Sequence, residues 1–544
     1  MGRWTAVAIL ASAQFVMVLD SSVMNVSISQ IVEDLDTTIQ GVQLAITAYT
    51  LVMAAFMLVG AKIGDIWGRE RAFAIGLAVY GAGSLTTALS PNLPVLLFGW
   101  SLVEGLGAVM VIPAIAALIA ANYEGKDRAL AYGMIGGVAA AAIAVGPVIG
   151  GYVTTTWTWR LVFVGEVVAV VAILLLRGRL KPSPRPERIP RLDLVGAALS
   201  AFGLALVVFG ILGSSSWGWI WPKGALTIGG TEITPFGFSI VPFLVLGGLV
   251  VLALFAEWEE HRAARGADTL VDLSMLRIDT LRAGLASLGM QQLILLGTFF
   301  VLPVYLQVVL GLDAFETGLR LLPMSATMLV AALTGPRIAA RRSPRRVVQA
   351  GLVALAIAAF ALVGTVDVEL DSIEFAIALA IFGVGVGLLA SQLGNVIMSS
   401  VAPGQTNEAG GLQGTAQNLG ASLGTALIGA IMLSALASGF TERVSQNPAL
   451  PPEVSAALTE LAQTEGLDVL PVDEVETLAL EAGVSPAVAE AIAADYGAAQ
   501  IDALRVALLA VAIFAVLGLW FTRRLPDRSL AADVPEPAVA AGSA

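Results

Sequence analysis

The sequence predicts an all-α integral membrane protein of fourteen transmembrane helices, in which two sets of six flank two inserted helices. Of its 544 residues, 57% are hydrophobic and only 13% are charged, which is too apolar for the water-facing surface of a soluble protein. Apolar runs long enough to cross a bilayer recur along the chain, and basic residues gather in alternate loops between them. We therefore expect a multi-pass protein of the cell membrane.

Fourteen apolar runs approach the length of about 20 residues that a spanning helix needs. The first run lacks the small-residue cleavage site of a separate signal peptide, so we expect it to remain as a helix. The expected spans are 6–28, 42–61, 72–90, 94–120, 131–152, 160–177, 193–213, 237–256, 283–309, 317–335, 347–365, 373–398, 409–437 and 502–522.

The loop charges predict that both termini are cytoplasmic. With that orientation, 24 of the 29 basic residues fall on the cytoplasmic side, where excess Lys and Arg are usual. An odd number of spans would break this alternation. Segment 399–408 is expected on the same side although it contains no basic residue.

The chain divides into two related halves. A basic, proline-rich linker over 177–191 follows the first six spans, and tight basic loops follow the second span of each set, at 60–71 and 335–346. Parallel six-helix halves with a binding site near the midplane between them form one major transporter architecture. The expected domains are a first bundle at 1–178, an inserted segment at 179–262, a second bundle at 278–526 and a cytoplasmic tail at 527–544.

An acidic loop accounts for most of the net charge of −12. Segment 439–501, between the last two spans, carries eleven Asp and Glu residues against Arg443 alone, which is −10 of the total. Its helix-like pieces are separated by Pro and Gly breaks. We expect it outside the membrane, either as a solvated cap or as a lid that gathers cations at the outer mouth.

Several classes of protein are excluded. The chain has no cysteine, so neither a disulfide framework nor a Cys-based metal site can form. None of its four lysines is followed by Ser or Thr, so it contains no Walker A motif and ATP hydrolysis is not expected. The single histidine, His261, lies in a charged segment and is interpreted as a solvated surface residue. We expect no enzymatic activity, cofactor, metal or nucleic-acid partner.

Three carboxylates lie inside apolar runs of the first bundle: Asp20, Glu104 and Glu166. A charge there is costly, so such residues are retained where something is bound or a proton is carried. At 1.5 Å per residue, Asp20 lies about 22 Å from the inner end of its span. Glu104 and Glu166 lie about 16 and 9 Å from the outer ends of theirs, which suits a shared site. Burial and mutual repulsion disfavour the ionised forms, so cation and proton would exclude each other. Alternatively, any one of them faces the outer interface or accepts a structural hydrogen bond.

Two motifs suggest moving helices. Asp65 and Arg69 are four residues apart, beside Gly64 and Gly68, so they can pair on one helical face as a cytoplasmic latch. A merely orienting basic loop is the alternative. In the fifth span, glycines with a proline among them permit a close helix crossing and a bend, although packing alone would explain the glycines; these residues are Gly146, Pro147, Gly150 and Gly151.

Amides and aromatic residues within the spans are candidates for lining a cavity. There are too many amides for a lipid-facing surface, so we expect several of them to line a cavity or join helices. With the acids, they suit lipophilic cations. The candidates are Asn25, Trp100, Gln291, Gln292, Phe299, Tyr305, Gln392, Asn395, Gln413 and Gln417.

At four places the chain resembles a known family. Residues 64–69 resemble the signature loop between helices two and three of the major facilitator superfamily, and residues 146–151 are similar to the antiporter motif of its drug exporters. Residues 19–26 and 410–420 resemble the first and thirteenth helices of its fourteen-helix drug:proton antiporter branch. The resemblance implies export of drugs in exchange for protons.

The chain departs from the family pattern at three positions. Ser101 stands where the fourth helix usually carries the arginine assigned to proton handling, and Gln417 stands where related exporters often place another arginine. Ala61 replaces the leading glycine of the helix two–three loop. With no basic residue within the membrane part of the first bundle, proton handling would fall to its carboxylates.

We therefore expect a proton-coupled antiporter that exports lipophilic, cationic compounds by alternating access, with small lipophilic molecules, protons and membrane lipids as its partners. One alternative is an exporter of an endogenous metabolite, lipid or siderophore. An alternative of another class is a non-transporting membrane sensor or scaffold that acts through the outer loop.

Overall fold

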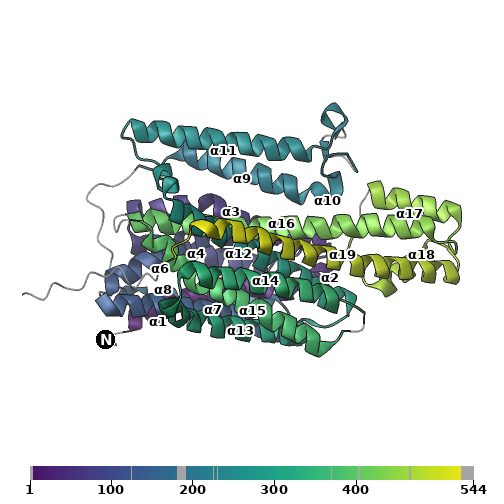
Figure 1. The fold of residues 1–544 in the computed structure, drawn as a ribbon, viewed down its shortest axis with the longest axis horizontal. Helices are drawn as coiled ribbons and strands as arrows, with labels where there is room; N and C mark the ends of the chain where they lie inside the picture. The colour runs from purple at the N-terminus through teal and green to yellow at the C-terminus, as the bar shows by residue number, and fades with distance from the viewer. Residues whose placement is uncertain are drawn as a thin grey trace, which may run out of the picture.

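The computed structural model describes residues 4–123, 125–180, 191–223, 226–228, 231–368, 370–401, 405–464 and 467–527. Long helices run side by side along the longest axis of the molecule (Figure 1). One end carries Arg69, Arg177, Arg341 and Arg523 at helix ends and is called the basic end; the opposite end is the capped end. The prolines of the expected linker, within 181–190, and nearly all of the expected tail lie outside the described residues.

The first set of helices covers the first six expected spans. A π-helical segment, η1, joins α5 to α6 within the fourth span. The elements are α1 (Thr5–Val26), α2 (Ile28–Asp34), α3 (Ile39–Trp67), α4 (Arg69–Ala88), α5 (Leu93–Leu96), η1 (Leu97–Glu104), α6 (Gly105–Asn122), α7 (Gly125–Thr156), α8 (Arg160–Leu176) and η2 (Arg177–Arg179).

The inserted pair and the second set follow. The inserted elements are α9 (Leu194–Leu212), α10 (Ser214–Trp217), the antiparallel strands β1 (Leu226–Ile228) and β2 (Thr231–Ile233), η3 (Pro235–Gly237), α11 (Val241–Ala264) and η4 (Leu273–Arg277). The second set comprises α12 (Asp279–Val304), η5 (Tyr305–Val309), α13 (Ala314–Arg341), α14 (Pro344–Thr365), α15 (Ser372–Ser399), α16 (Thr406–Gln446), α17 (Pro452–Thr464), α18 (Val472–Glu481), α19 (Pro486–Phe521) and η7 (Thr522–Arg524).

The fourteen predicted spans each correspond to a helix. Among the described residues, twelve helices are long and apolar enough to cross a membrane, and the bent pair Met134–Ile143 and Val145–Thr156 of α7 makes thirteen. The remaining span, 72–90, is α4, which is less hydrophobic because its first turn carries Arg69, Glu70 and Arg71 and its second half contains Gly, Ser and Thr. It packs within the bundle against α6 and α8, where small residues allow close contact.

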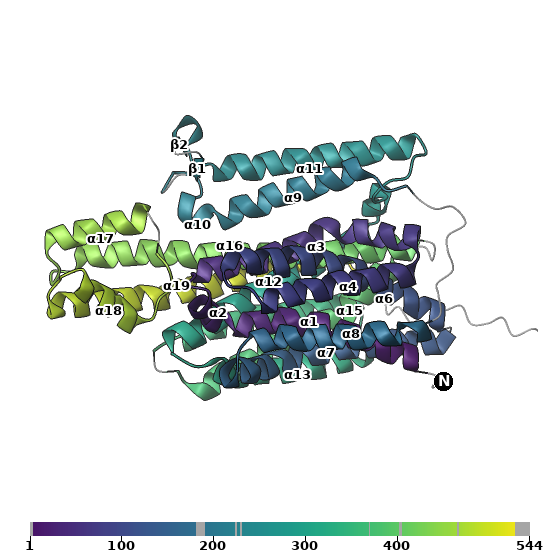
Figure 2. The ribbon, with the colours of Figure 1, turned by 180° about the vertical axis from the view of Figure 1, so that it is seen from behind.

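Two pairs of helices join the halves. On one side α7 packs on α13, and on another α3 packs on α16, with α1 meeting α12 between them. Figure 2 shows the first set lying against the second along its length. Large residues such as Phe73, Phe163, Phe300 and Phe382 are fully buried, so the hydrophobic core runs through both halves.

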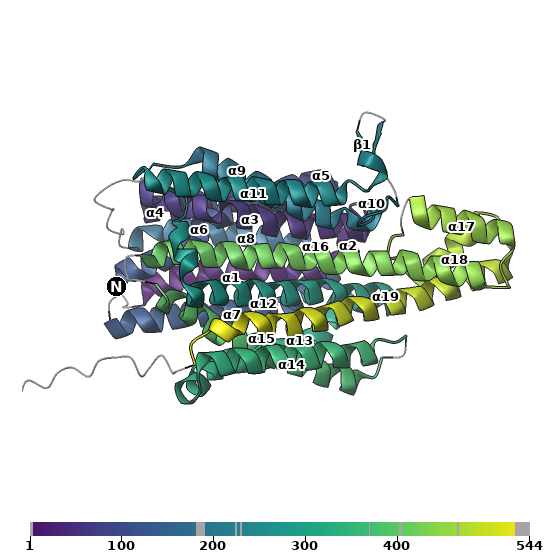
Figure 3. The same ribbon diagram turned by 45° about the horizontal axis from the view of Figure 1, so that its top comes forward.

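The acidic segment forms a helical cap. Helices α16 and α19 continue past the other helices, and α17 and α18 pack on them (Figure 3). The hydroxyl of Tyr496 donates to the carbonyl of Asp468 and accepts from the amide of Leu470 at 2.9 Å, which fixes the α17–α18 connection. Burial raises the pKa of the Asp468 carboxyl. The cap extends away from the bundle, as expected for a solvated cap.

The inserted pair is held together at the basic end by Asp193. Helices α9 and α11 pack on each other, and α9 lies against α3 and α16. Asp193 caps α9 through the amide of Gly196 at 3.1 Å, accepts the Trp258 indole N–H at 2.8 Å and pairs with Arg262 at 3.3 Å. Burial alone would raise the pKa of Asp193, but these contacts outweigh it and lower that pKa.

Replacing Asp193 with Ala should destabilise the α9–α11 pair by about 2 kcal/mol or more, because a helix cap and a charged hydrogen bond each contribute about that order. The lowered pKa means that this stabilisation is complete above the unfolded pKa of about 4 and is lost as pH falls below it. Limited proteolysis of the purified protein measures the opening. Asp371→Ala, which removes the cap of α15, is the control and should leave cleavage between α9 and α11 unchanged.

Candidate functional site

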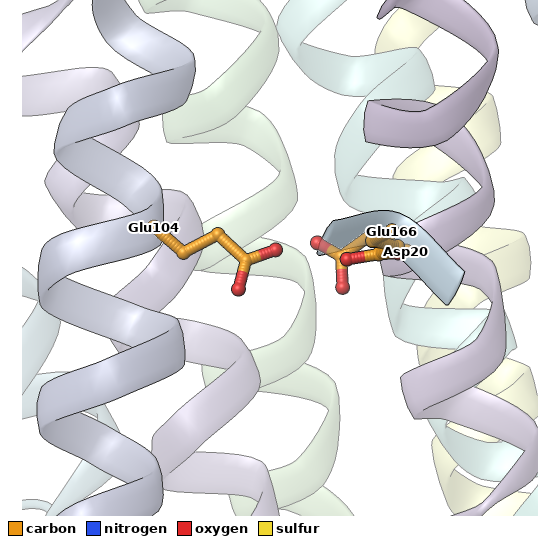
Figure 4. Close-up of side chains that lie close together, drawn as sticks. All are labelled: Asp20, Glu104 and Glu166. Carbon is orange, nitrogen blue, oxygen red and sulfur yellow. The ribbon is translucent and has the colours of Figure 1, made fainter. Parts of the chain in front are cut away.

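Three buried carboxylates meet inside the first bundle. Asp20 of α1, Glu104 at the end of η1 and Glu166 of α8 are 0%, 0% and 3% exposed. One oxygen from each lies within 4.8 Å of the others, and Figure 4 shows the carboxyl groups pointing toward one another. The structure therefore brings together the three acids selected from the sequence. Among the described residues, this is also the one group whose spacing would suit a metal ion.

Hydrogen bonding differs among the three acids. The Trp100 indole N–H donates to both carboxylate oxygens of Asp20, at 2.9 and 3.0 Å. Glu166 accepts from the Ser84 hydroxyl at 2.8 Å and from the Tyr80 hydroxyl at 3.4 Å. Among the described residues, neither oxygen of Glu104 has a hydrogen-bond partner. Three ionised carboxylates cannot share a dry site at this spacing, so the cluster must hold protons or a cation.

Glycines place Glu104 at this point. A Cβ on Gly83 of α4 would lie 2.7 Å from the Cα of Glu104, and one on Gly107 would lie 2.6 Å from the Cα of Tyr80. Only glycines allow α4 to approach η1 and α6 so closely. Glu104 and Trp100 also share the π-helical segment η1. The π-helix is rare in proteins overall, but where it occurs it is frequently at a functional site.

Ser101, at the position where the family places an arginine, has a structural contact. Its hydroxyl donates to the carbonyl of Ala45 in α3 at 2.8 Å. The side chain is 2% exposed and joins two helices of the first bundle. No charge is supplied to the cluster from this position.

A cavity of about 210 Å³ lies between the two halves, next to the cluster. Its walls come from α1, α3, η1, α6, α7, α12 and α16, and are mostly apolar. Five of the ten candidate residues line it: Asn25, Trp100, Gln292, Phe299 and Gln417. Asp20, Glu104 and Glu166 are not among its lining residues, which corrects the expectation that acids and cargo share one open space.

The other five candidates lie elsewhere. Gln291 is buried and donates to the carbonyl of Val386, while Tyr305 donates to that of Asp367 at 2.7 Å, so both join helices. Gln392 bonds within its own helix, Asn395 accepts from Ser399, and Gln413 has a buried side-chain oxygen without a partner. The helical periodicity of the sequence could not distinguish these five residues from the five that line the cavity.

The loop after α3 has the expected latch geometry. Arg69 and Asp65 form an ion pair, and the Arg69 side chain lies against Gly64. Gly68 alone connects α3 to α4, with a φ of 93° that favours glycine. Nearby at the basic end, Lys62 of α3 lies 3.8 Å from Glu408 of α16, an ion pair between the two halves.

The glycine–proline motif of α7 lies where the halves meet. A Cβ on Gly146 or Gly150 would clash with Ser22 or Val23 of α1. A Cβ on Gly151 would clash with the backbone of Ala314 at the start of α13. The 43° bend of α7 falls between Ile143 and Val145, where Pro147 cannot donate to the carbonyl four residues earlier.

Two glutamines join the halves toward the capped end. Gln43 of α3 donates to the carbonyl of Thr425 in α16 at 2.8 Å. In the other direction, Gln307 of η5 donates to the carbonyl of Val26 at 2.8 Å and accepts from the Ser29 hydroxyl at 2.8 Å. These contacts join the two halves on the capped side. Their only sequence signal is polarity within apolar runs, as for Tyr80 and Ser84.

Comparison with known proteins decides the family. Residues 10–425 match the profile of the Major Facilitator Superfamily. The chain belongs to the major facilitator superfamily. It is thus a multi-pass membrane transporter rather than an enzyme.

Antibiotic exporters are among the relatives of this transporter. It is 29% identical to the "Probable actinorhodin transporter" of Streptomyces coelicolor over 85% of this chain and 76% of that protein. It is 30% identical to "Puromycin resistance protein pur8" of Streptomyces alboniger, over 80% of this chain and 83% of that protein. It is 27% identical to the "Tetracenomycin C resistance and export protein" of Streptomyces glaucescens, over 99% of this chain and 95% of that protein.

Solved structures show the same fold at low identity. An inward-facing, occupied bacterial homologue of the human lysosomal transporter Spinster matches with a TM-score of 0.60 and 14% identity, over 95% of both chains. A D-xylose–proton symporter matches with a TM-score of 0.57 and 11% identity, over 86% of this chain and 98% of that one.

Proposed function

We propose that this transporter exports lipophilic, preferably cationic, compounds in exchange for protons. The observation that carries the proposal is the cluster of Asp20, Glu104 and Glu166, three buried carboxyl groups with oxygens within 4.8 Å beside a mostly apolar cavity. Their charges cannot coexist without protons or a cation, so the cluster changes proton occupancy when water or positive charge approaches.

The cavity supports a lipophilic cargo. Tyr49, Trp100 and Phe299 present aromatic surface, and Asn25, Gln292 and Gln417 provide a few polar groups. Such a lining binds apolar molecules and favours positive charge through the ring faces. Relatives named for resistance to, or export of, antibiotics agree with this chemistry.

The contacts between the two halves support alternating access. Gln43 and Gln307 join the halves toward the capped end, and the Lys62–Glu408 pair joins them at the basic end. Rocking one half against the other would exchange these sets of contacts and expose the cavity to the other side. The loop charges predict that the basic end is cytoplasmic.

Export of an endogenous product is the second candidate function. Two relatives carry the names of antibiotics, actinorhodin and tetracenomycin C, together with the words transporter or export. The same cavity would serve such a molecule if it is lipophilic, since the polar side chains that line it are uncharged amides and hydroxyls.

The test is uptake of ethidium, a lipophilic cation, into everted membrane vesicles with an acidic interior. We expect accumulation that requires the chain and is abolished by a protonophore. A variant without residues 445–495 should still accumulate ethidium, because the cap packs on α16 and α19 outside the cavity. Accumulation that persists without a pH gradient would contradict proton coupling. Loss of uptake in a folded cap deletion would favour the sensor or scaffold alternative.

A further inference from the structure

Trp100 belongs to both the carboxylate cluster and the cavity. Its indole N–H donates to both oxygens of Asp20, at 2.9 and 3.0 Å, and the residue also lines the cavity. Its ring stacks on Tyr49 with centroids 4.6 Å apart and planes at 3°. Tyr49 also lines the cavity, so the two rings form an aromatic wall, defined here as Tyr49 and Trp100.

The wall separates cargo from acids. All five residues are buried, but the three carboxylates are absent from the cavity lining and both wall residues, each 1% exposed, are part of it. Cargo in this cavity therefore meets the wall and not the carboxylates. Direct competition between cargo and proton for one carboxylate cannot operate in this arrangement.

We propose that Trp100 couples cargo binding to proton release: a cation bound against the aromatic wall strengthens the indole N–H bond to ionised Asp20 and so drives a proton from the cluster. The inference rests on the proposed function and names the residue that connects its two sites. Trp100 is a positioning residue in this scheme, since the proton itself is held by the carboxylates.

Elementary electrostatics gives the direction of the effect. A cation is attracted to the face of an indole ring, and positive charge there makes the N–H edge a better donor. A hydrogen bond to the charged form of a carboxyl favours that form, and the effect is larger in a low-dielectric interior. Cargo on the ring and negative charge on Asp20 therefore stabilise each other across the wall.

Other titratable groups surround Asp20 and share the proton. Glu104 of η1 and Glu166 of α8 have oxygens within 4.8 Å of it, and Tyr49 of α3 and Tyr80 of α4 interact with it electrostatically. Trp100 and Glu104 lie four residues apart in η1, so a displacement of this segment would move both of them. The released proton is thus a property of the cluster.

Trp100→Phe tests the proposal because it removes the N–H donor and keeps an aromatic ring, although a smaller one. Ethidium-induced proton release by the purified, full-length protein is followed with a pH dye in weak buffer, beside ethidium binding by fluorescence. We expect binding within about threefold of wild type. The pH midpoint of proton release should rise by about one unit, because a hydrogen bond to a charged group contributes roughly that much.

The matched control is Trp159→Phe. Trp159 is also fully buried, and it donates its indole N–H to Asp34 at 2.9 Å, away from the cluster. Loss of this equivalent bond should leave the pH midpoint unchanged. A shift equal to that of Trp100→Phe would show that any buried tryptophan has this effect and would overturn the proposal.

A double-mutant cycle identifies the partner. Asp20→Asn keeps an acceptor for the indole and cannot titrate, so adding Trp100→Phe to it should cause no further shift. An equal shift in both backgrounds would overturn the proposal. If Trp100→Phe does not fold, ultraviolet resonance Raman spectra of the wild type replace it: ethidium should alter the indole N–H signal, and Asp20→Asn should abolish that change. An unaltered signal would overturn the proposal.

The experiments distinguish failure of the proposed proton coupling from failure of the role of Trp100. If the wild type binds ethidium without releasing protons, the proposed function fails and this inference fails with it. If the wild type releases protons and Trp100→Phe does so with an unchanged midpoint, proton coupling stands and only the role of Trp100 is refuted.

Discussion

Glu104→Gln is expected to lower proton-driven accumulation of ethidium while leaving ethidium binding intact. Gln has the shape of a protonated Glu, so the variant permanently imitates one protonation state of the cluster. One pH unit of gradient can support about a tenfold ratio of cargo for each coupled proton. Losing one proton should therefore lower the maximal ethidium ratio about tenfold for each pH unit imposed across everted vesicles.

The variant should fold, which makes the result interpretable. Glu104 has no hydrogen-bond partner, and Glu166 has one oxygen that also lacks one. The new amide can donate in this neighbourhood, and replacing a buried charge by a neutral group is often neutral or stabilising. A collapse of thermal stability would contradict this account of the cluster.

Glu259→Gln is the matched control for Glu104→Gln. Glu259 is also a buried glutamate, at 1% exposed, but it lies in the inserted pair, where it accepts from the amide of Val271 at 3.1 Å. Its substitution should leave the ethidium ratio at the wild-type value. A wild-type ratio in Glu104→Gln as well would show that Glu104 carries no coupled proton.

The sequence predicted the spans and the three acids because both carry strong signals in an apolar chain. A bilayer imposes a fixed length on each helix, so the runs could be identified from hydropathy alone. A carboxylate in such a run is so costly that Asp20, Glu104 and Glu166 were each identifiable without any knowledge of packing. The structure then showed that the three meet.

The sequence did not predict which amides face the cavity or that a wall separates it from the acids. Gln291 and Gln292 are adjacent in the sequence, yet one joins helices and the other lines the cavity. This difference depends on the rotation of α12 against its neighbours, and an almost uniformly apolar helix carries little information on rotation. The role of Trp100 likewise depends on a contact with a residue 80 positions away.

The small residues of α7 show why a motif can be recognised before its purpose is clear. From the sequence, Gly146, Gly150 and Gly151 indicate only that something passes closely. In the structure the first two meet α1, and Gly151 meets α13 of the opposite half. One motif therefore fixes α7 within its own bundle and against the other bundle, on the closed side of the cavity.

Gly151→Ala and Gly318→Ala, each alone, are expected to open the capped side of the cavity. A Cβ on Gly151 would lie 2.7 Å from the carbonyl carbon of Ala314, and one on Gly318 would lie 2.7 Å from that of Pro147. These are contacts with backbone, so no side-chain rotation relieves them. Overpacking of this kind costs about 1–3 kcal/mol, which disfavours the closed state roughly 5- to 150-fold.

Cysteine labelling measures the opening, since the natural chain contains no cysteine and needs no prior substitution. Ser21→Cys places a thiol in the cavity lining. A membrane-impermeant maleimide added from the capped side should label it slowly in the Ser21→Cys background. Adding Gly151→Ala or Gly318→Ala should raise the labelling rate in proportion to the open population, while ethidium export falls.

Gly364→Ala distinguishes a gate effect from a general effect of replacing glycine in a membrane helix. Gly364 lies in α14, and a Cβ there would meet no atom within 4 Å. It should therefore change neither the labelling rate nor export. Unchanged labelling in both gate variants, with export still lost, would mean that the α7–α13 contact stabilises the fold without controlling access. Faster labelling in both would instead show that two glycines on opposite halves hold one side of the cavity closed, because their only shared feature is the backbone contact that each one permits.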